Sequence, residues 1–194
     1  MIWVFGLGAT AFLLAACGWI YMTSNVATPA YTVTETDGAV ELRDYPDFLV
    51  AEITTQGSRR EAVSAGFRPL AGYIFAKERE GEKIAMTAPV TQRADEGGTW
   101  TVQFIMPEGY TLESLPKPTG SKVRLDTEPG TRRAAIQFSG SWSDDLFAAE
   151  EKKLRDWLSA RGLSPQGAPN YAYYNDPFTP GFMRRNEVIF DLGN

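Results

Sequence analysis

Few side chains in this sequence could serve as metal ligands, nucleophiles or general bases. The 194 residues include no histidine, and the single cysteine, Cys17, lies in an apolar N-terminal stretch. These two facts exclude triads that use histidine, zinc sites of the usual histidine-containing kinds, haem held by a proximal histidine, and intramolecular disulfides. Iron could take only methionine or tyrosine from the body of the chain, and the candidates are Met86, Met106, Met183, Tyr73, Tyr171 and Tyr173. We expect these side chains to pack rather than to bind metal.

Acid–base catalysis has little support in the sequence. The segment from Met86 to Val90 contains no acid, base or nucleophile beyond the Thr87 hydroxyl. An enzyme would need an acidic residue such as Glu52 or Glu187 to face a cleft with a raised pKa. The formal net charge is -5 and neither half of the chain is basic, so the positive field that nucleic-acid binding requires is missing. We therefore predict no catalytic residue, no metal site and no nucleic-acid partner.

The first 24 residues carry no charged side chain and predict a membrane attachment. The run from Ile2 to Met22 is long enough to cross a bilayer as a helix. One interpretation is an uncleaved anchor, with Trp19 and Tyr21 at the interface. Another is a lipoprotein signal, because the Leu-Ala-Ala-Cys sequence that ends at Cys17 looks like a bacterial lipobox and would have its thiol lipidated. Simple cleavage and a cytosolic start are further alternatives.

The domain boundaries follow from this N-terminal pattern. We assign residues 1–24 to the anchor or lipoprotein signal, 25–30 to a short tether and 31–194 to one folded domain. No lysine or arginine follows the apolar run until Arg43, which favours a domain outside the cytoplasm. The expected location is a bacterial cell membrane, with the domain on the periplasmic side.

Two segments of the domain have the pattern of amphipathic helices. The first begins at Ser58, whose hydroxyl can form a capping box with Glu61, and Pro69 predicts a kink or a break within it. The second runs from about Asp144 to Arg161 and ends before a glycine. The apolar positions of the first helix recur at helical spacing and are Val63, Phe67, Leu70, Ala71 and Ile74.

The remaining apolar alternation predicts strands, and the chain divides into two similar halves. Strands are expected around residues 40–45, 48–55, 83–90, 100–106, 123–125, 134–138 and 188–192. Ala51, Ile53, Gly57 and Ser58 have the same residue types 83 positions later, and in each half a strand, a helix and further strands follow in order. We therefore predict an α+β domain of two similar halves, in which the strands form a shared sheet or barrel and the helices lie on it.

Several short motifs follow one another in a fixed order along the domain. One is Lys83-Ile84-Ala85-Met86-Thr87-Ala88-Pro89-Val90. Others are VELRDY at 40–45, F-x-x-L-x-x-YI at 67–74, F-x-MP at 104–107, P-x-P at 116–118, FSG at 138–140, and the ending from Tyr174 through RRNEV at 184–188. Together they cover nearly all of residues 31–192 and resemble the SOUL/haem-binding protein family. The most specific is the 83–90 segment, which is similar to the family's KI-x-MT-x-PV signature.

The resemblance implies a non-enzymatic domain that binds haem or another tetrapyrrole. It also implies a distorted antiparallel β-barrel flanked by two helices. In the family's best-described mode the ligand lies in a hydrophobic groove along the first helix, without an axial histidine. Carried over to this sequence, the groove would comprise Val63, Phe67, Leu70, Ala71, Tyr73 and Ile74. Arginines could pair with the propionates, and the candidates are Arg184 and Arg185, with Arg59, Arg60 and Arg68.

Three alternatives stay open from the sequence. The helix stripe could simply face the core, as such stripes usually do, and Arg184 and Arg185 could hold the last strand or the proline-rich loop. A groove of this kind could also take another planar or amphipathic small molecule, since histidine is missing and Ala71 is small. An enzyme acting on such a ligand is the third. The sequence does not predict the oligomeric state.

Overall fold

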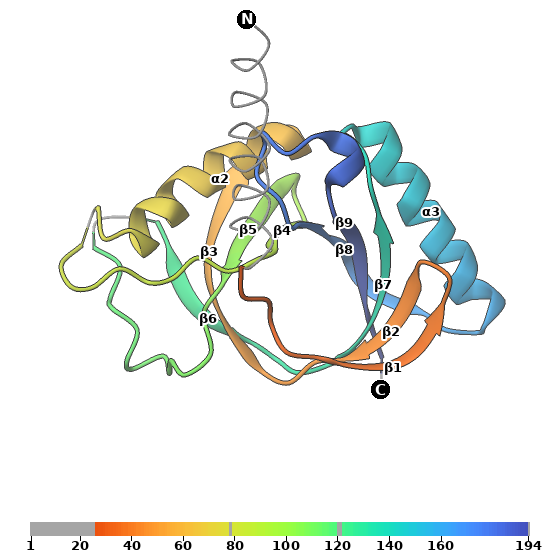
Figure 1. Ribbon diagram of the computed structural model, residues 1–194, viewed down its shortest axis with the longest axis horizontal. Coiled ribbons are helices and arrows are strands. Elements are labelled where there is room, and N and C mark those ends of the chain that lie inside the picture. The colour runs from red at the N-terminus through yellow and green to blue at the C-terminus, as the bar shows by residue number, and fades with distance from the viewer. Residues whose placement is uncertain (1–25, 78, 120–121, 194) are drawn as a thin grey trace, which may run out of the picture.

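The computed structural model describes residues 26–77, 79–119 and 122–193. Nine antiparallel strands form one strongly curved, open sheet in the order β1-β2-β7-β9-β8-β4-β5-β3-β6 (Figure 1). The strands are β1 (Thr32–Asp37), β2 (Val40–Asp44), β3 (Phe48–Gln56), β4 (Val90–Ala94), β5 (Thr99–Ile105), β6 (Arg124–Glu128), β7 (Arg132–Phe138), β8 (Pro165–Tyr173) and β9 (Asn186–Leu192). The expected α+β class is confirmed, and the sheet is not closed into a barrel.

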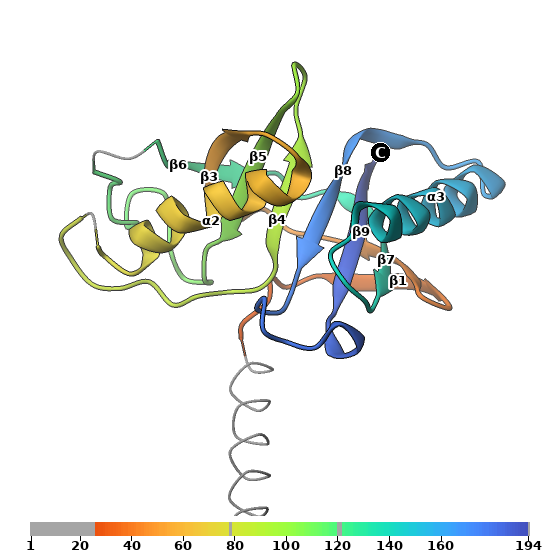
Figure 2. The same ribbon diagram turned by 90° about the horizontal axis from the view of Figure 1, so that it is seen from above.

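Two long helices cover the outer face of the sheet (Figures 1 and 2). Helix α2 (Arg59–Ile74) packs on β3 and β5, and helix α3 (Asp144–Ala160) packs on β7, β8 and β9. Each helix closes a separate hydrophobic cluster, and Val63 of α2 contacts both clusters. A single turn of 3-10 helix, η1 (Gly181–Met183), lies between β8 and β9.

Local sequence signals account for both helices. The Ser58 backbone N–H donates to the Glu61 carboxylate (3.0 Å) and the Glu61 N–H donates to the Ser58 hydroxyl (3.5 Å), so the expected capping box is present. The bond from the Ser58 N–H, together with a bond from the Ser58 hydroxyl to the same carboxylate (2.8 Å), lowers the pKa of Glu61. Helix α2 continues through Pro69, so of the expected kink or break the break is wrong. Pro69 has no N–H to donate to the carbonyl of Ala65, an exposed residue, and the helix loses only this one bond.

Close approach between α2 and the sheet depends on a glycine. A Cβ atom on Gly66 would lie 2.7 Å from the Cβ atom of Val102 on β5. Such a distance is far inside van der Waals contact, so only glycine allows α2 to lie this near to β5. The distance between α2 and β5 therefore depends on Gly66, a residue that is not part of the predicted apolar stripe.

The two halves are related by the register of their strands. Ala51 on β3 lies opposite Phe104 on β5, and Ala134 on β7 lies opposite Phe190 on β9. The order β7-β9-β8 on one side of the sheet mirrors β3-β5-β4 on the other, and the two halves join where β8 pairs with β4. The pseudo-duplication expected from the 83-residue repeat is therefore present in the topology.

Three strands differ from the expectation. Strand β1 was missed because all six of its residues are exposed and show no alternation. Strand β8 was missed because it contains two prolines and Gly167, where the register shifts. The expected strand at 83–90 was wrong: Thr87 makes only an isolated bridge with Ala27, and regular pairing begins after Pro89.

The N-terminal assignments fall outside the described residues, with the exception of the tether. Residues 1–24, and with them Cys17, are not described, so their interpretation stays a prediction. Within the tether, the carbonyl of Ala27 accepts a hydrogen bond from the Ala88 N–H (2.8 Å). Among the residues that the structure does describe, none of the helices has both the length and the apolar character to cross a membrane.

Candidate functional site

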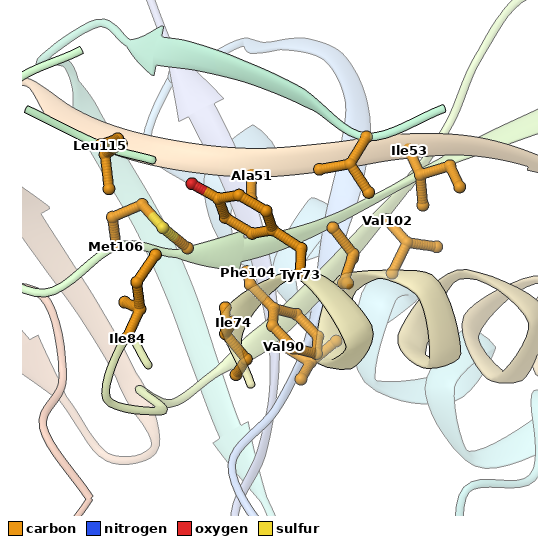
Figure 3. Packing of buried hydrophobic residues seen from close by; sticks show 12 residues of the cluster. Ala51, Ile53, Tyr73, Ile74, Ile84, Val90, Val102, Phe104, Met106 and Leu115 are labelled. Carbon is orange, nitrogen blue, oxygen red and sulfur yellow. The ribbon is translucent and has the colours of Figure 1, made fainter. Parts of the chain in front are cut away.

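The six groove residues expected on the first helix divide into two sets. Leu70, Tyr73 and Ile74 are at most 3% exposed and lie in the cluster between α2 and the sheet. Figure 3 shows Tyr73 and Ile74 among Phe104, Ile84 and Met106, and the Tyr73 hydroxyl donates to the carbonyl of Pro116 (2.8 Å). A ligand could reach these three side chains only by displacing the core.

The other set is accessible and forms a row along α2. Val63 and Ala71 are half-buried, and Phe67 is 39% exposed with its ring edge-on to Phe104 (centroids 5.2 Å apart). Phe75, at the end of the helix, is 38% exposed and continues the same i, i+4 spacing. We call Val63, Phe67, Ala71 and Phe75 the α2 row; its 12-residue span corresponds to about 18 Å along the helix axis. Phe75 was not predicted, although its spacing from Ala71 was a sufficient signal.

The arginines beside this row differ in their availability. Arg59 is buried, donating to Asp144 (2.8 Å), the Tyr173 hydroxyl (2.6 Å) and the carbonyl of Trp142 (2.9 Å), so it ties the two helix starts together. Arg60 and Arg68 are exposed and lie on the solvent side of the row. Neither guanidinium has an ion pair within the part of the chain that the structure describes.

Arg184 and Arg185 are held by the protein itself. Arg184 donates to the carbonyls of Thr179 (2.7 Å) and Pro177 (2.8 Å) and stacks on Trp142. Arg185 pairs with Glu187 (2.7 Å) and lies over the Tyr174 ring. Both therefore organise the segment between β8 and β9, which is the structural alternative left open by the sequence.

A charged network fills the inner face of the curved sheet, away from the helices. Arg43 donates to both carboxylate oxygens of Glu187 (2.8 and 3.0 Å), and both side chains are at most 1% exposed. Burial alone would raise the pKa of Glu187, but Arg43 and Arg185 outweigh it and the pKa is lowered. This is the reverse of the raised carboxyl pKa that an acid–base enzyme would need.

The cavity on this inner face is small. It measures about 20 Å³, close to the space that one water molecule needs. Polar and aromatic side chains line it, among them Tyr45, Gln103, Arg133, Asn170 and Tyr174, and Pro29 of the tether lies at its edge. A tetrapyrrole does not fit this space.

The possible iron ligands lie in different parts of the fold: Tyr73 and Met106 are in the cluster under α2, and Tyr171 and Tyr173 are at the cluster under α3. Met106 is buried in the α2 cluster, whereas Met86 and Met183 are partly exposed in different segments. Burial raises the pKa of Tyr173 to about 12 and the pKa of Tyr171 further, which disfavours the phenolate form that binds iron. No group of three or more histidine, cysteine, aspartate or glutamate side chains suited to a metal ion occurs within the described ranges.

Comparison with known proteins agrees with the arrangement of strands and helices. A model of the family described as SOUL heme-binding protein matches residues 26–191. The chain belongs to the SOUL haem-binding protein family. A relative, Heme-binding protein 2 of Mus musculus, is 28% identical over 159 residues, which cover 78% of this chain and 77% of the relative.

Solved structures that share this fold carry other descriptions. A hydrolase from Listeria innocua matches 82% of this chain and 94% of its own (TM-score 0.58, 14% identity). The C-terminal domain of EcmrR matches 84% of this SOUL chain and 98% of its own (TM-score 0.58, 14% identity). At such low identity the similarity establishes the fold alone.

Proposed function

We propose that this SOUL domain binds haem or a related tetrapyrrole non-covalently along the α2 row. The observation that carries the proposal is a row of four half-exposed apolar residues flanked by two arginines without ion-pair partners in the described structure. A porphyrin is a flat apolar plate with two carboxylates at one edge. Its plate would cover Val63, Phe67, Ala71 and Phe75, and its propionates would pair with Arg60 and Arg68.

The energetics favour plate burial over the ionic contacts. Each square ångström of apolar surface removed from water contributes about 25 cal/mol before ordering costs. An exposed arginine–carboxylate pair is worth only about 0–1 kcal/mol, so Arg60 and Arg68 would orient the ligand more than hold it. Phe67 is central because it reaches solvent while its ring is fixed against Phe104.

Binding of this kind needs no bond to iron. The sequence contains no histidine, and burial raises the pKa of Tyr173 and Tyr171, which disfavours a phenolate ligand. We therefore expect a metal-free porphyrin to bind about as well as its iron complex. A related planar or amphipathic molecule is the alternative ligand, because a shallow row selects by shape and apolar area rather than by a specific bond.

We further propose that the domain is a binder without catalytic activity, attached to a bacterial membrane on its periplasmic side. The haem-binding description of the family and the lowered pKa of Glu187 support the first part. The uncharged run from Ile2 to Met22 supports the second, whether it acts as an anchor or as a signal that ends in lipidation of Cys17.

Absorption titration of the purified full-length protein tests the ligand. Hemin and protoporphyrin IX are added separately, and the Soret band is followed to saturation. The proposal expects a saturable shift at one equivalent for both compounds, weakened by the pair of substitutions Arg60→Glu and Arg68→Glu. Binding of hemin alone would indicate an iron ligand and contradict the proposed mode. A porphyrin absorbance change that grows without saturation would contradict a specific site and would mean that the domain binds another ligand.

A further inference from the structure

The β8–β9 loop, residues 174–185, presents the most exposed large apolar side chains of the described chain. Phe178 is 83% exposed, Phe182 is 80% exposed and Met183 is 43% exposed. Two exposed phenylalanine rings so near one another in sequence are unfavourable on a surface that faces only water, and exposed apolar side chains of this kind mark interaction sites. They do not lie on the α2 row and have no part in the proposed ligand site.

This loop is braced and not a loose tip. Asp176 accepts hydrogen bonds from the N–H groups of Phe178 (2.7 Å) and Thr179 (3.1 Å), and Arg184 donates to two loop carbonyls. The carbonyl of Gly181 accepts from the N–H of Gly140 (2.9 Å), which fastens η1 to the start of α3. The backbone is thus held in a shape that points both phenylalanine rings outward.

The start of the described chain lies beside the same loop. The Arg185 guanidinium lies 3.4 Å from the Tyr31 hydroxyl, and Pro29 shares a cavity with Tyr174. In Figure 2 the first described residues, in orange, emerge at the side of the domain where the dark-blue loop lies. The 25 residues that precede Val26 include the uncharged run from Ile2 to Met22, so a membrane attached to that run would meet this side of the domain.

Charge at the loop suits a lipid surface. Arg184 bonds to backbone carbonyls and has no acidic partner within the described residues, whereas Asp176 is engaged by the loop itself. Aromatic side chains next to an uncompensated cation are typical of segments that enter the headgroup region of an anionic bilayer.

We infer that the β8–β9 loop is a second membrane contact, inserting Phe178 and Phe182 into the lipid interface and so fixing the orientation of the domain. The inference rests on the proposed attachment through the N-terminal run and is independent of the ligand. A loop anchored in this way holds η1 and the start of α3 next to the membrane, since the Gly140–Gly181 hydrogen bond joins them.

Lipid cross-linking in nanodiscs tests the inference on the full-length protein. Discs of phosphatidylethanolamine and phosphatidylglycerol are doped with a phospholipid that carries a diazirine on its acyl chain. Trypsin releases the loop within the peptide that extends from Gly162 to Arg184, because no lysine or arginine interrupts it. The control is the peptide that contains the β4–β5 hairpin at Asp95–Gly98, which lies at the opposite end of the domain in Figure 2.

The inference expects lipid adducts on the N-terminal peptide and on Phe178 or Phe182, with none on the hairpin. The double substitution Phe178→Ser and Phe182→Ser should reduce loop adducts at least about tenfold, a partition difference of about 1.4 kcal/mol, and leave the N-terminal adducts unchanged. N-terminal adducts without loop adducts would overturn the second contact alone. The absence of lipid adducts from both the N-terminal peptide and the loop would overturn the membrane attachment as well. Equal labelling of the β4–β5 hairpin would show that the diazirine reacts non-specifically and would contradict insertion of the loop.

Discussion

Arg43 and Glu187 are 144 residues apart in the chain and joined by two hydrogen bonds, of 2.8 and 3.0 Å, on the inner face of the sheet. Both side chains are at most 1% exposed, and Arg185 (2.7 and 3.0 Å) and Tyr174 (2.9 Å) donate further hydrogen bonds to the same carboxylate. The network links β2 in the first half to β9 in the second, across β7. A buried pair of this kind matters chiefly because neither partner tolerates the loss of the other.

Glu187→Gln should lower the free energy of unfolding by up to about 3–5 kcal/mol, because it removes the buried carboxylate that Arg43 and Arg185 share and leaves Arg43 with Glu41 (2.8 Å) as its acidic partner. Urea denaturation followed by circular dichroism measures the change. The matched control is Asp156→Asn, which breaks the exposed Lys152–Asp156 pair on α3 and should change stability little. Equal effects of the two substitutions would show that the buried pair is not special.

Stability should also fall in acid because of this carboxylate. The pKa of Glu187 is lower in the folded state than its ordinary value of 4.5. Its contribution is therefore complete above the unfolded pKa and is lost as the pH falls through the folded pKa. Urea denaturation of the wild type and Glu187→Gln should give free energies of unfolding that differ most near neutral pH and converge as the pH falls below 4.5 and through the lowered folded pKa. A difference that grew in acid would mean that the carboxyl is protonated in the fold.

The two helices offer a matched comparison of N-caps. Ser58 forms the capping box of α2, whereas Ser143 at the start of α3 makes no capping hydrogen bond through its side chain. Ser58→Ala should cost about 1 kcal/mol of stability, and Ser143→Ala should cost much less. Thermal unfolding of both variants checks this, and equal losses would contradict the role assigned to the capping box.

These helix signals show what a local pattern can predict. The capping box, the length of α3 and its Glu151–Arg155 pair (2.8 Å) all follow from residues within a few positions of each other. The duplicated halves were visible for the same reason, as a repeat in residue types. The buried network was not, because Arg43 and Glu187 become neighbours only through pairing of β2 and β9 with β7.

The candidate site was predicted only in part, for a geometric reason. A stripe on an amphipathic helix is wider than the surface that the sheet covers, so its residues divide between the core and the rim. Leu70, Tyr73 and Ile74 enter the core, whereas Val63, Phe67 and Ala71 stay at the rim. The sequence pattern predicts the apolar stripe, but it does not predict how α2 lies on β5, which depends on the close approach of Gly66 and Val102.

Gly66→Ala should therefore destabilise the protein although alanine is the better helix former. We expect a loss of about 1–3 kcal/mol from overpacking against Val102, against a gain of up to about 1 kcal/mol in helix propensity. Val102→Gly removes all three atoms that the new Cβ would meet, so the double variant should be less destabilised than the sum of the two single substitutions in a double-mutant cycle measured by urea denaturation. Additive effects would mean that the contact is not the cause.

The central claim is that the ligand lies on the exposed part of α2, and Phe67→Asp tests it most directly. Phe67 is 39% exposed, and Leu112, 41% exposed in the segment between β5 and β6, provides a matched control as Leu112→Asp. Protoporphyrin IX is titrated into each full-length variant, with thermal unfolding to verify the fold. The account predicts at least about tenfold weaker binding for Phe67→Asp, about 1.4 kcal/mol, and unchanged binding for Leu112→Asp. Unchanged affinity in a folded Phe67→Asp protein would contradict the α2 row as the binding site.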